Sequence, residues 1–294
     1  MEQTRKFLYV KSEGLEKHDP GFSEKYTSKK DTQEEFQCQI DELRKLQSKL
    51  YAQAKYGVLI ILQAMDAAGK DGVIKHVMSG VNPQGCHVTS FQAPSKEELA
   101  HDYMWRCMKN MPKRGNIGIF NRSYYEEVLI AKVHPEILSK QNLPFYHAKL
   151  HLDEDFWKKR YQDIVNIEKY MVHNGFLVIK FFLHLSFEEQ KRRFLSRIDN
   201  EYKNWKFTMN DINDRQYWNE FQFAYRDMLN KTNHKKAPWY VIPADKKWYM
   251  RLVVSKIIVE KLQSIELKYP EVTQQHKTDM LIGREILMNE GNHK

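Results

Sequence analysis

The sequence predicts an α/β fold in which a mostly parallel sheet is covered by helices on both faces. Three observations favour it. Short apolar runs alternate with helical segments along the chain, which is typical of parallel sheets. The run "YGVLIILQA", from Tyr56, is unbroken and apolar, as in a strand buried on both faces. A glycine-containing turn then leads into the helical segment "KDGVIKHVMSG", and a phosphate-binding loop requires this order of strand, turn and helix.

The remaining strands are predicted from four further apolar runs. These are "CHVTSF", "NIGIFN", "FLVIKFFLHL" and "PWYVIP", which occupy residues 86–91, 116–121, 176–185 and 238–243. Ligands of parallel α/β sheets bind at the carboxyl ends of the strands. Residues 63–72 and 121–127 fall at two such ends, so we expect the functional site there.

The helices are predicted from capping residues and from apolar periodicity. Thr32 and Glu35 have the spacing of a capping box, and apolar residues recur after them every three or four positions, which indicates a helix over about 32–54. Ser186 and Glu189 form a second such pair. Further helices are expected from Ser95 to about Lys109, up to Val133, over about 147–173 and 187–198, and from Asp245.

Length and composition indicate one elaborated domain. The chain has 294 residues, 41% of them hydrophobic, which is enough to bury one full core. We place this domain at 31–265, after a poorly packed N-terminal extension at 1–30 and before a C-terminal tail at 266–294. The three cysteines are not in metal-ligand spacing, which disfavours a disulfide scaffold or a zinc site and favours the reducing cytoplasm.

The charge balance favours a polyanionic partner. Lys and Arg number 47 against 38 Asp and Glu, so the net charge is +9. Nucleic acid, an acidic membrane and a phosphate polymer all satisfy this condition. The N-terminus has no apolar segment typical of a signal peptide, and the longest aliphatic run is too short to cross a bilayer, so we expect no membrane partner.

The segment "QAMDAAGKDG", residues 63–72, resembles a phosphate-binding loop with two departures. The common pattern is Gly, four residues, then Gly-Lys and Ser or Thr. Here Ala64 replaces the first glycine, Asp71 replaces the hydroxyl residue, and Asp66 adds a second carboxylate. The small residues still allow backbone N–H groups to face an anion, and Lys70 supplies a cation. The alternative is an ordinary glycine-capped turn with an exposed lysine.

The two carboxylates of this segment need a separate explanation. Beside a bound polyphosphate, Asp66 and Asp71 would repel it unless they hold Mg²⁺, or Mn²⁺ in its place, because such cations take oxygen ligands and bridge phosphates. The simpler alternative is that both are solvated loop residues, with Asp71 favouring the helix start through the helix dipole.

A second polar stretch, "GIFNRSYYEEV" at residues 118–128, follows another predicted strand. It contains Asn121, Arg122, Glu126 and Glu127. A metal-binding acid and a phosphate-binding arginine belong at such a strand end in a phosphoryl-transfer site. The alternative is a polar strand end followed by a solvated helical turn.

These stretches resemble the polyphosphate kinase 2 family. "MDAAGKDG", "NPQG" at 82–85, "FNRSYYEEVL" and "PWYVIPADKKWYMRLVVSKII" look like its motifs, in its order, over about residues 20–265. The resemblance implies a P-loop kinase fold of the thymidylate-kinase type with a helical lid. It also implies transfer of a phosphoryl group between inorganic polyphosphate and a nucleotide, in which Lys70 and Arg122 bind polyphosphate while Asp66 and an acid of the second motif bind Mg²⁺.

One position departs from the family. Many members have Asp in "FDRSWY" where this chain has Asn121, so that metal ligand cannot be carried over. We expect Glu126 to replace it, with Glu127 as the alternative. The "FNRS" version resembles the subgroup that acts on both nucleoside mono- and diphosphates. From the two motifs together, the expected catalytic residues are Asp66, Lys70, Asp71 and Arg122.

A basic segment, "KRRFLSRIDNEYKNWKF" at 191–207, is the expected lid. It places Arg193 and Arg197 on one helix face, with Lys203 and Lys206 beyond. We define the lid segment as residues 192–212. Such a stripe suits a lid that closes over a chain of phosphates and excludes water, whereas the alternative is a solvated basic helix face. The expected polyphosphate contacts are Lys70, Lys75, Arg122, Arg193, Arg197 and Lys206.

The sequence thus predicts a Mg²⁺-dependent phosphotransferase that acts on polyphosphate and on AMP, ADP, GMP or GDP. Nucleotide contacts are assigned to Asn82, Gln84 and Arg106, which are polar residues near predicted strand or helix ends. One alternative is an ATP-dependent nucleoside monophosphate kinase of the same architecture. Another is a basic nucleic-acid-binding protein, although the chain has no recognisable nucleic-acid module. We expect a cytoplasmic homo-oligomer, either a dimer or a tetramer.

Overall fold

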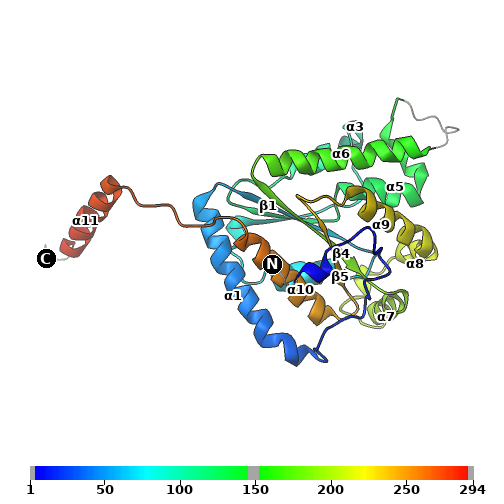
Figure 1. The fold of residues 1–294 in the computed structure, drawn as a ribbon, viewed down its shortest axis with the longest axis horizontal. Helices are drawn as coiled ribbons and strands as arrows, with labels where there is room; N and C mark the ends of the chain where they lie inside the picture. Colours follow the sequence, from blue (N-terminus) through cyan, green and yellow to red (C-terminus); the bar gives the residue numbers. More distant parts are fainter. Residues whose placement is uncertain (1–3, 145–151, 291–294) are drawn as a thin grey trace.

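A computed structural model describes residues 4–144 and 152–290 of the chain. In these residues five parallel strands form one sheet in the order β2-β3-β1-β4-β5 (Figure 1). The strands are β1 (Gly57–Gln63), β2 (Cys86–Ser90), β3 (Ile117–Asn121), β4 (Phe176–His184) and β5 (Trp239–Pro243). Each lies on one of the five predicted apolar runs, so the α/β fold class is confirmed.

Helices cover both faces of the sheet, and each face has its own apolar core (Figure 1). In the central strand, Val58, Ile60 and Leu62 face one core, whereas Leu59 and Ile61 face the other. One core is covered by α1 (Lys29–Gln53), α2 (Lys70–Val77) and α10 (Lys247–Gln263), and the other by α4 (Trp105–Lys109), α6 (Glu154–His173) and α9 (Trp218–Thr232). An unbroken apolar strand is therefore the sequence signature of burial on both sides.

The described residues also form five further α-helices and five short 3₁₀ helices. The α-helices are α3 (Lys96–Ala100), α5 (Ile130–Val133), α7 (Phe187–Ile198), α8 (Met209–Gln216) and α11 (Gln274–Asn289). Short 3₁₀ helices are η1 (Arg5–Phe7), η2 (Pro83–Gly85), η3 (Tyr124–Val128), η4 (Pro135–Gln141) and η5 (Asn204–Lys206). No helix in the described part of the chain is long and apolar enough to cross a membrane.

Several helix boundaries differ from the sequence prediction. Helix α1 begins at Lys29 because Asp31 accepts hydrogen bonds from the backbone N–H of Ser28, so the capping box lies one turn before the predicted one. The predicted helix from Ser95 to Lys109 is broken into α3 and α4, since Asp102 caps the backbone N–H of Met104 between them. Helix α6 starts at Glu154, and the earlier residues of its predicted range, up to 151, lie outside the described residues.

The N-terminal residues pack better than the sequence predicts. Leu8 forms an antiparallel bridge with Tyr240 of β5, and the backbone N–H of Tyr9 donates to the carbonyl of Trp239. Phe7 and Leu15 are also buried. Within the expected extension at 1–30, the described residues from 4 on are therefore anchored to the rest of the protein by a few apolar side chains without periodicity.

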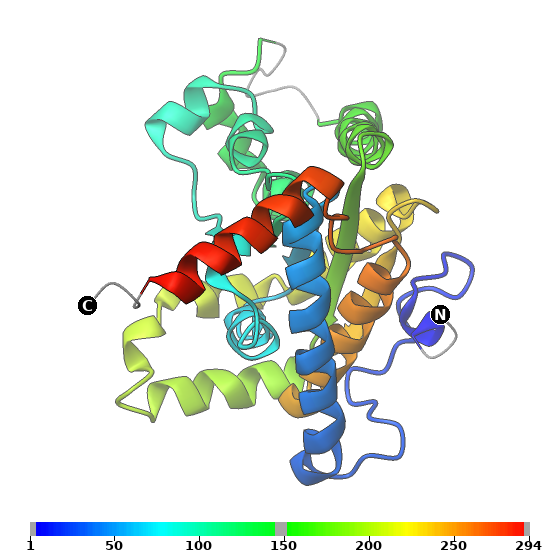
Figure 2. The ribbon, with the colours of Figure 1, turned by 90° about the vertical axis from the view of Figure 1, so that its left-hand side faces the viewer.

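The C-terminal helix α11 lies away from the rest of the protein (Figure 1). Figure 2 views the molecule from the side of α11, which is drawn in red in front of the other elements. Its apolar side chains are more than half exposed, among them Leu281, Leu287 and Met288 at 67–70%. The tail predicted at 266–294 is thus helical over Gln274–Asn289.

A buried ion pair joins β4 to α6 beneath the sheet. The Nζ of Lys180 lies 2.6 Å from Oε2 of Glu168, and both side chains are fully buried. The hydroxyls of Tyr124 and Tyr125 donate to the other oxygen of Glu168, at 3.0 and 2.6 Å. Since both tyrosines belong to η3, this network fixes the segment that follows β3.

Candidate active site

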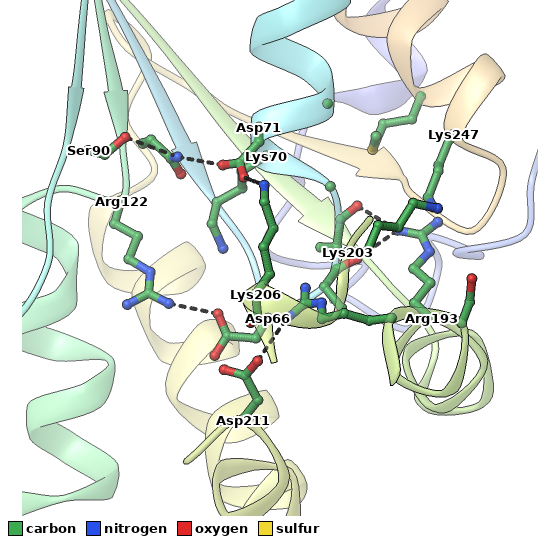
Figure 3. A pocket seen from close by; sticks show the side chains of 18 of the residues that line it. Asp66, Lys70, Asp71, Ser90, Arg122, Arg193, Lys203, Lys206, Asp211 and Lys247 are labelled. Carbon is green, nitrogen blue, oxygen red and sulfur yellow. Dashed lines mark hydrogen bonds and ion pairs between the residues drawn. The ribbon is translucent and has the colours of Figure 1, made fainter. Parts of the chain in front are cut away.

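A pocket of about 740 Å³ opens at the carboxyl ends of β1 and β3 (Figure 3). The loop between β1 and α2 forms its floor, and the lid segment and α10 form other walls. Nine cationic side chains line it, against three carboxylates. The cations are Lys70, Arg122, Arg192, Arg193, Arg197, Lys203, Lys206, Lys247 and Arg251, and the carboxylates are Asp66, Asp71 and Asp211.

The loop after β1 has the backbone of a tight anion-binding turn. Ala67 and Gly69 adopt positive φ angles of 62° and 108°. Lys70, the first residue of α2, is only 9% exposed, and its Nζ donates to the carbonyl of Ala64 at 2.9 Å. Burial and the charge of Arg122 lower the pKa of Lys70, although Asp66 opposes this shift. The exposed lysine of the alternative reading is therefore not what the structure shows.

Asp66 and Arg122 form an ion pair across the pocket floor (Figure 3), with 2.7 Å between Oδ1 and Nη2. Burial opposes ionisation of Asp66, but the charges of Lys70 and Arg122 outweigh it and lower the pKa of this carboxyl. Arg122 itself has a φ of 63°, a conformation that non-glycine residues hold only where the surroundings enforce it. The two motifs predicted to cooperate thus meet at this pair.

Asp71 lies in the first turn of α2 and connects two other parts of the pocket. Its Oδ1 accepts from Nδ2 of Asn121 at 3.0 Å, and its Oδ2 lies 2.9 Å from Nζ of Lys206 in the lid segment. Burial raises the pKa of Asp71, whereas the hydrogen bonds from Lys206 and Asn121 lower it. The hydrogen bonds outweigh burial, so the pKa lies below its usual value. Asp71 therefore remains ionised at neutral pH.

The two candidate glutamates of η3 have different surroundings. Glu126 lies near Asp66 and Arg122 in a small cavity beside the main pocket, and the buried amide of Gln63 donates to it at 2.9 Å in the favoured amide orientation. Burial raises the pKa of Glu126 against the opposing charges of Arg122 and Lys70.

Glu127, by contrast, points away from the pocket. Its carboxylate is 9% exposed, lies 2.9 Å from Nη1 of Arg160 and accepts from Gln141. The carboxylate of Glu127 is therefore already bound by Arg160 and Gln141. This geometry disfavours Glu127 as the alternative metal ligand and leaves Glu126 as the candidate.

The donor atoms of the pocket suit a hard divalent cation held partly by substrate. Oδ1 of Asn121 is buried without a hydrogen-bond partner in the described structure, while its Nδ2 is fixed by Asp71 and Ser90. An amide oxygen of this kind is a ligand that Mg²⁺ accepts. Within residues 4–144 and 152–290 no three His, Cys, Asp or Glu residues cluster as a complete metal site, and Mg²⁺ commonly uses only one or two carboxylates plus phosphates.

The lid segment brings its basic residues to the pocket in different ways. Arg197 lines it and pairs with Asp211 at 2.7 Å. Lys203 and Lys206 also line it, as does the 75% exposed indole of Trp205. Lys75, on the exposed side of α2, is not among the lining residues. Its predicted contact with polyphosphate is not supported by this geometry.

The residues predicted to contact the nucleotide lie elsewhere. Asn82 and Gln84 precede β2, so they are at the amino-terminal edge of the sheet, opposite the pocket. Arg106 is 6% exposed and donates to the carbonyl of Gln92 at 2.7 Å. This geometry does not support the three assignments, because two of the residues lie at the opposite edge of the sheet and the third holds a loop.

Several pocket residues were not predicted from the sequence. Lys247 and Arg251 lie one turn apart at the start of α10, and Arg192 lies beside Arg193. The i,i+4 spacing of Lys247 and Arg251 in "KKWYMRL" is the same signal that indicated the lid. The sequence alone does not assign this pair to the pocket, because the position of α10 relative to the β1 loop depends on the sheet order.

The comparisons with known proteins agree with this architecture. The family model described as Polyphosphate kinase 2 matches residues 26–270. An ADP-polyphosphate phosphotransferase of Rhodopseudomonas palustris is 49% identical over 263 residues, covering 90% of each chain. An AMP/ADP-polyphosphate phosphotransferase of Meiothermus ruber is 44% identical over 229 residues, covering 78% of this chain and 80% of its own.

A solved structure is also similar. The crystal structure of polyphosphate kinase 2 from Arthrobacter aurescens superposes with a TM-score of 0.85 and 33% identity, covering 95% of this chain and 96% of that one. A second, from Pseudomonas aeruginosa, has a TM-score of 0.75 at 27% identity and covers 85% of this chain. These similarities agree with the geometry of the β1–α2 loop, the Asp66–Arg122 ion pair and the lid segment. The chain belongs to the polyphosphate kinase 2 family.

Proposed function

We propose that this enzyme is a Mg²⁺-dependent phosphotransferase that moves a phosphoryl group between inorganic polyphosphate and nucleoside mono- or diphosphates. The observation that carries the proposal is the pocket lined by nine cationic and three acidic side chains, built on a strand, turn and helix. A donor made only of phosphate brings dense negative charge, and this excess of cations complements it. Family membership supports the same reaction class.

Each residue of the pocket has a role in this proposal. Lys70 and Arg122 bind the transferring phosphoryl group from opposite sides, while Arg197 and Lys206 hold the polyphosphate chain under the lid segment. Asp66 orients Arg122 through their ion pair. Positioning and neutralisation of charge supply the catalysis, so no covalent protein intermediate is needed. A phosphate oxygen of the acceptor is already ionised near pH 7, so Asp71 need not act as a strong base.

Asp66, Asn121 and Glu126 are the residues that would hold Mg²⁺, with Mn²⁺ as a substitute. The metal would supply charge neutralisation between neighbouring phosphates. The unpartnered Oδ1 of Asn121 supports its inclusion. It also offers an answer to the absence of the family's aspartate at this position: an amide oxygen replaces a carboxylate oxygen, at lower charge.

The acceptors we propose are AMP, ADP, GMP and GDP. One relative is an ADP-polyphosphate phosphotransferase and the other an AMP/ADP-polyphosphate phosphotransferase, and the "FNRSYY" motif resembles the subgroup that accepts mono- and diphosphates. Trp205 and Lys206 are adjacent in the lid segment, with the lysine 5.1 Å from the indole ring, so an exposed aromatic surface stands beside the phosphate path.

The test is a product analysis with purified protein. Mg²⁺ and long-chain polyphosphate are supplied, AMP, ADP, GMP and GDP are offered separately, and nucleotide products are separated by ion-exchange chromatography. We expect a product one phosphate longer than the acceptor, dependent on both Mg²⁺ and polyphosphate. Formation of ADP from AMP and ATP without polyphosphate would instead indicate an ATP-dependent nucleotide kinase. Salt-sensitive RNA binding without any transfer would indicate a nucleic-acid-binding protein.

We also propose that the enzyme is a cytoplasmic homo-oligomer, as a dimer or tetramer. The exposed apolar side chains of α11 support this, because an isolated helix of this length is only marginally stable in water and uncovered apolar surface of this kind favours association. Light scattering of the full chain measures the oligomeric state directly. A monomer at micromolar concentration would contradict the proposal.

A further inference from the structure

We infer that Arg193 and Gln190, on one face of α7, are positioning residues that hold the carbonyl groups of the β1–α2 loop away from the bound anion. The inference deepens the proposed function, since it assigns a new role within the same site. It differs from the sequence prediction for Arg193, which was a direct contact with polyphosphate.

The guanidinium of Arg193 is occupied entirely by protein oxygens. Arginine has five N–H groups, and the structure gives each of them an acceptor. Nε donates to Glu189, Nη1 donates to the carbonyls of Ala67 and Ala68 at 3.0 and 2.7 Å, and Nη2 donates to those of Ala244 and Asp245 at 2.5 and 3.0 Å. The side chain is 6% exposed. Arg193 therefore has no N–H group left for a phosphate unless it releases the loop.

Gln190 extends the same contact by one residue. It lies one turn before Arg193 on α7, is 1% exposed, and its Nε2 donates to the carbonyl of Asp66 at 3.0 Å. Its Oε1 is held by Arg215 of α8 at 2.8 Å. Three successive loop carbonyls, those of residues 66, 67 and 68, are thus bound by two side chains of one helix.

Lys70 completes the set from the other end of the loop. Its Nζ donates to the carbonyl of Ala64 at 2.9 Å and lies 3.5 Å from that of Met65. Five consecutive carbonyls, from residue 64 to residue 68, therefore have cationic or amide donors. When a polyphosphate enters, the ammonium of Lys70 can turn to it, but the α7 contacts remain.

The consequence follows from the geometry of the peptide group. A trans peptide is planar, and its C=O and N–H point in opposite directions. Binding the carbonyl of Ala68 therefore directs the N–H of Gly69 away from the arginine, and anion-binding turns depend on such oriented N–H groups. The same contacts hold Ala67 at its φ of 62°, which surrounding structure must enforce in a non-glycine residue.

The contacts that Arg193 and Gln190 make with the loop, which we call the clamp, also link the loop to the lid segment. The lid segment begins within α7, so Arg193 belongs to it, and the second pair of Arg193 acceptors, Ala244 and Asp245, lies between β5 and α10. One side chain thereby joins the phosphate loop, the base of the lid and the start of α10. Displacement of α7 would therefore disturb the loop.

The experiment compares Arg193→Met with Arg192→Met, a matched control. Arg192 is adjacent, pairs with the same Glu189 and has a side chain 71% exposed. Hydrogen exchange of the peptide that contains residues 64–72 is measured without polyphosphate, together with kcat and KM for polyphosphate. For Arg193→Met we expect loop exchange to rise on the order of tenfold and kcat to fall on the order of 100-fold, with a smaller change in KM. Arg192→Met should leave loop exchange unchanged.

Two results would overturn the inference. Unchanged loop exchange in Arg193→Met would show that the arginine does not order the loop. A rise in KM with kcat retained would show a direct contact with polyphosphate. Arg193→Lys, which keeps the charge but can reach fewer carbonyls, guards against a variant that fails to fold and should give an intermediate exchange rate. Because loop exchange is measured without substrate, it tests the clamp even if the proposed phosphotransfer is refuted.

Discussion

Lys206 of the lid segment lies 2.9 Å from Asp71, so a lysine that follows α7 is joined to the first turn of α2. Both side chains are substantially exposed, at 41% and 67%, and water screens such a pair. Its contribution to the free energy of unfolding is therefore well under ~1 kcal/mol, and its importance lies in where it places the lysine.

For Lys206→Met we expect nearly unchanged thermal stability and a fall in kcat/KM for polyphosphate of about tenfold or more, since one cation of the phosphate path is lost. Steady-state kinetics and a thermal melt measure the two effects. Lys191→Met, an exposed lysine on α7 that does not line the pocket, is the matched control. An equal loss of kcat/KM in Lys206→Met and Lys191→Met would show that the net positive charge of the protein matters and the position of Lys206 does not.

Asn121 is predicted to be the oxygen ligand that replaces the family's aspartate. Asn121→Ala should raise the Mg²⁺ concentration for half-maximal activity by about tenfold, whereas Asn121→Asp should lower it, because a carboxylate binds Mg²⁺ more strongly than an amide. Activity is titrated with Mg²⁺ at fixed polyphosphate. If both variants raise the requirement, the residue acts by donating to Asp71 and not as a ligand.

The buried pair of Lys180 and Glu168 gives a prediction about stability. Glu168→Gln leaves Lys180 buried without a countercharge, which should lower the free energy of unfolding by about 3–5 kcal/mol. The double variant Glu168→Gln with Lys180→Met removes both charges and should recover a large part of that loss. Urea unfolding measures both. A double variant no more stable than the single one would contradict this electrostatic explanation.

His184, the last residue of β4, gives a prediction about pH. Burial lowers its pKa to about 4, whereas an unfolded histidine has a pKa near ~6.5. Between these values the unfolded chain binds the proton and the folded chain does not, so stability falls as the pH is lowered from about 6.5 to 4.

The expected loss from this group between pH 7 and pH 5 is about 2 kcal/mol. Urea unfolding at both values, for the wild type and for His184→Gln, isolates it, because the glutamine does not titrate. The pH-dependent loss should be smaller in the variant. An identical loss in the two proteins would show that His184 is not responsible.

The sheet was predictable because its signal is local. Each strand is a short apolar run, and burial on both faces leaves no polar residue in β1 before Gln63, its last position. The pairing of the two site motifs was also predictable, since β1 and β3 are neighbours and their carboxyl ends bring Asp66 and Arg122 within 2.7 Å.

The direction of individual side chains was not predictable. Glu126 and Glu127 are adjacent in sequence, yet one lies beside the pocket and the other beside Arg160, because successive residues of the 3₁₀ helix η3 point about 120° apart. Arg193 and Arg197 share a helix face, yet one binds backbone carbonyls and the other an aspartate. Spacing gives the face of a helix, whereas the partner on that face depends on long-range packing.

The most direct test of the central claim compares wild type with Lys70→Ala for polyphosphate-dependent phosphorylation of AMP and ADP. Lys158→Ala, an exposed lysine of α6 far along the chain from the loop, serves as the control, and circular dichroism confirms folding. We predict that wild type and Lys158→Ala transfer phosphate at similar rates, and that Lys70→Ala remains folded but transfers at least ~1,000-fold more slowly. A folded Lys70→Ala protein with a normal rate would contradict the account.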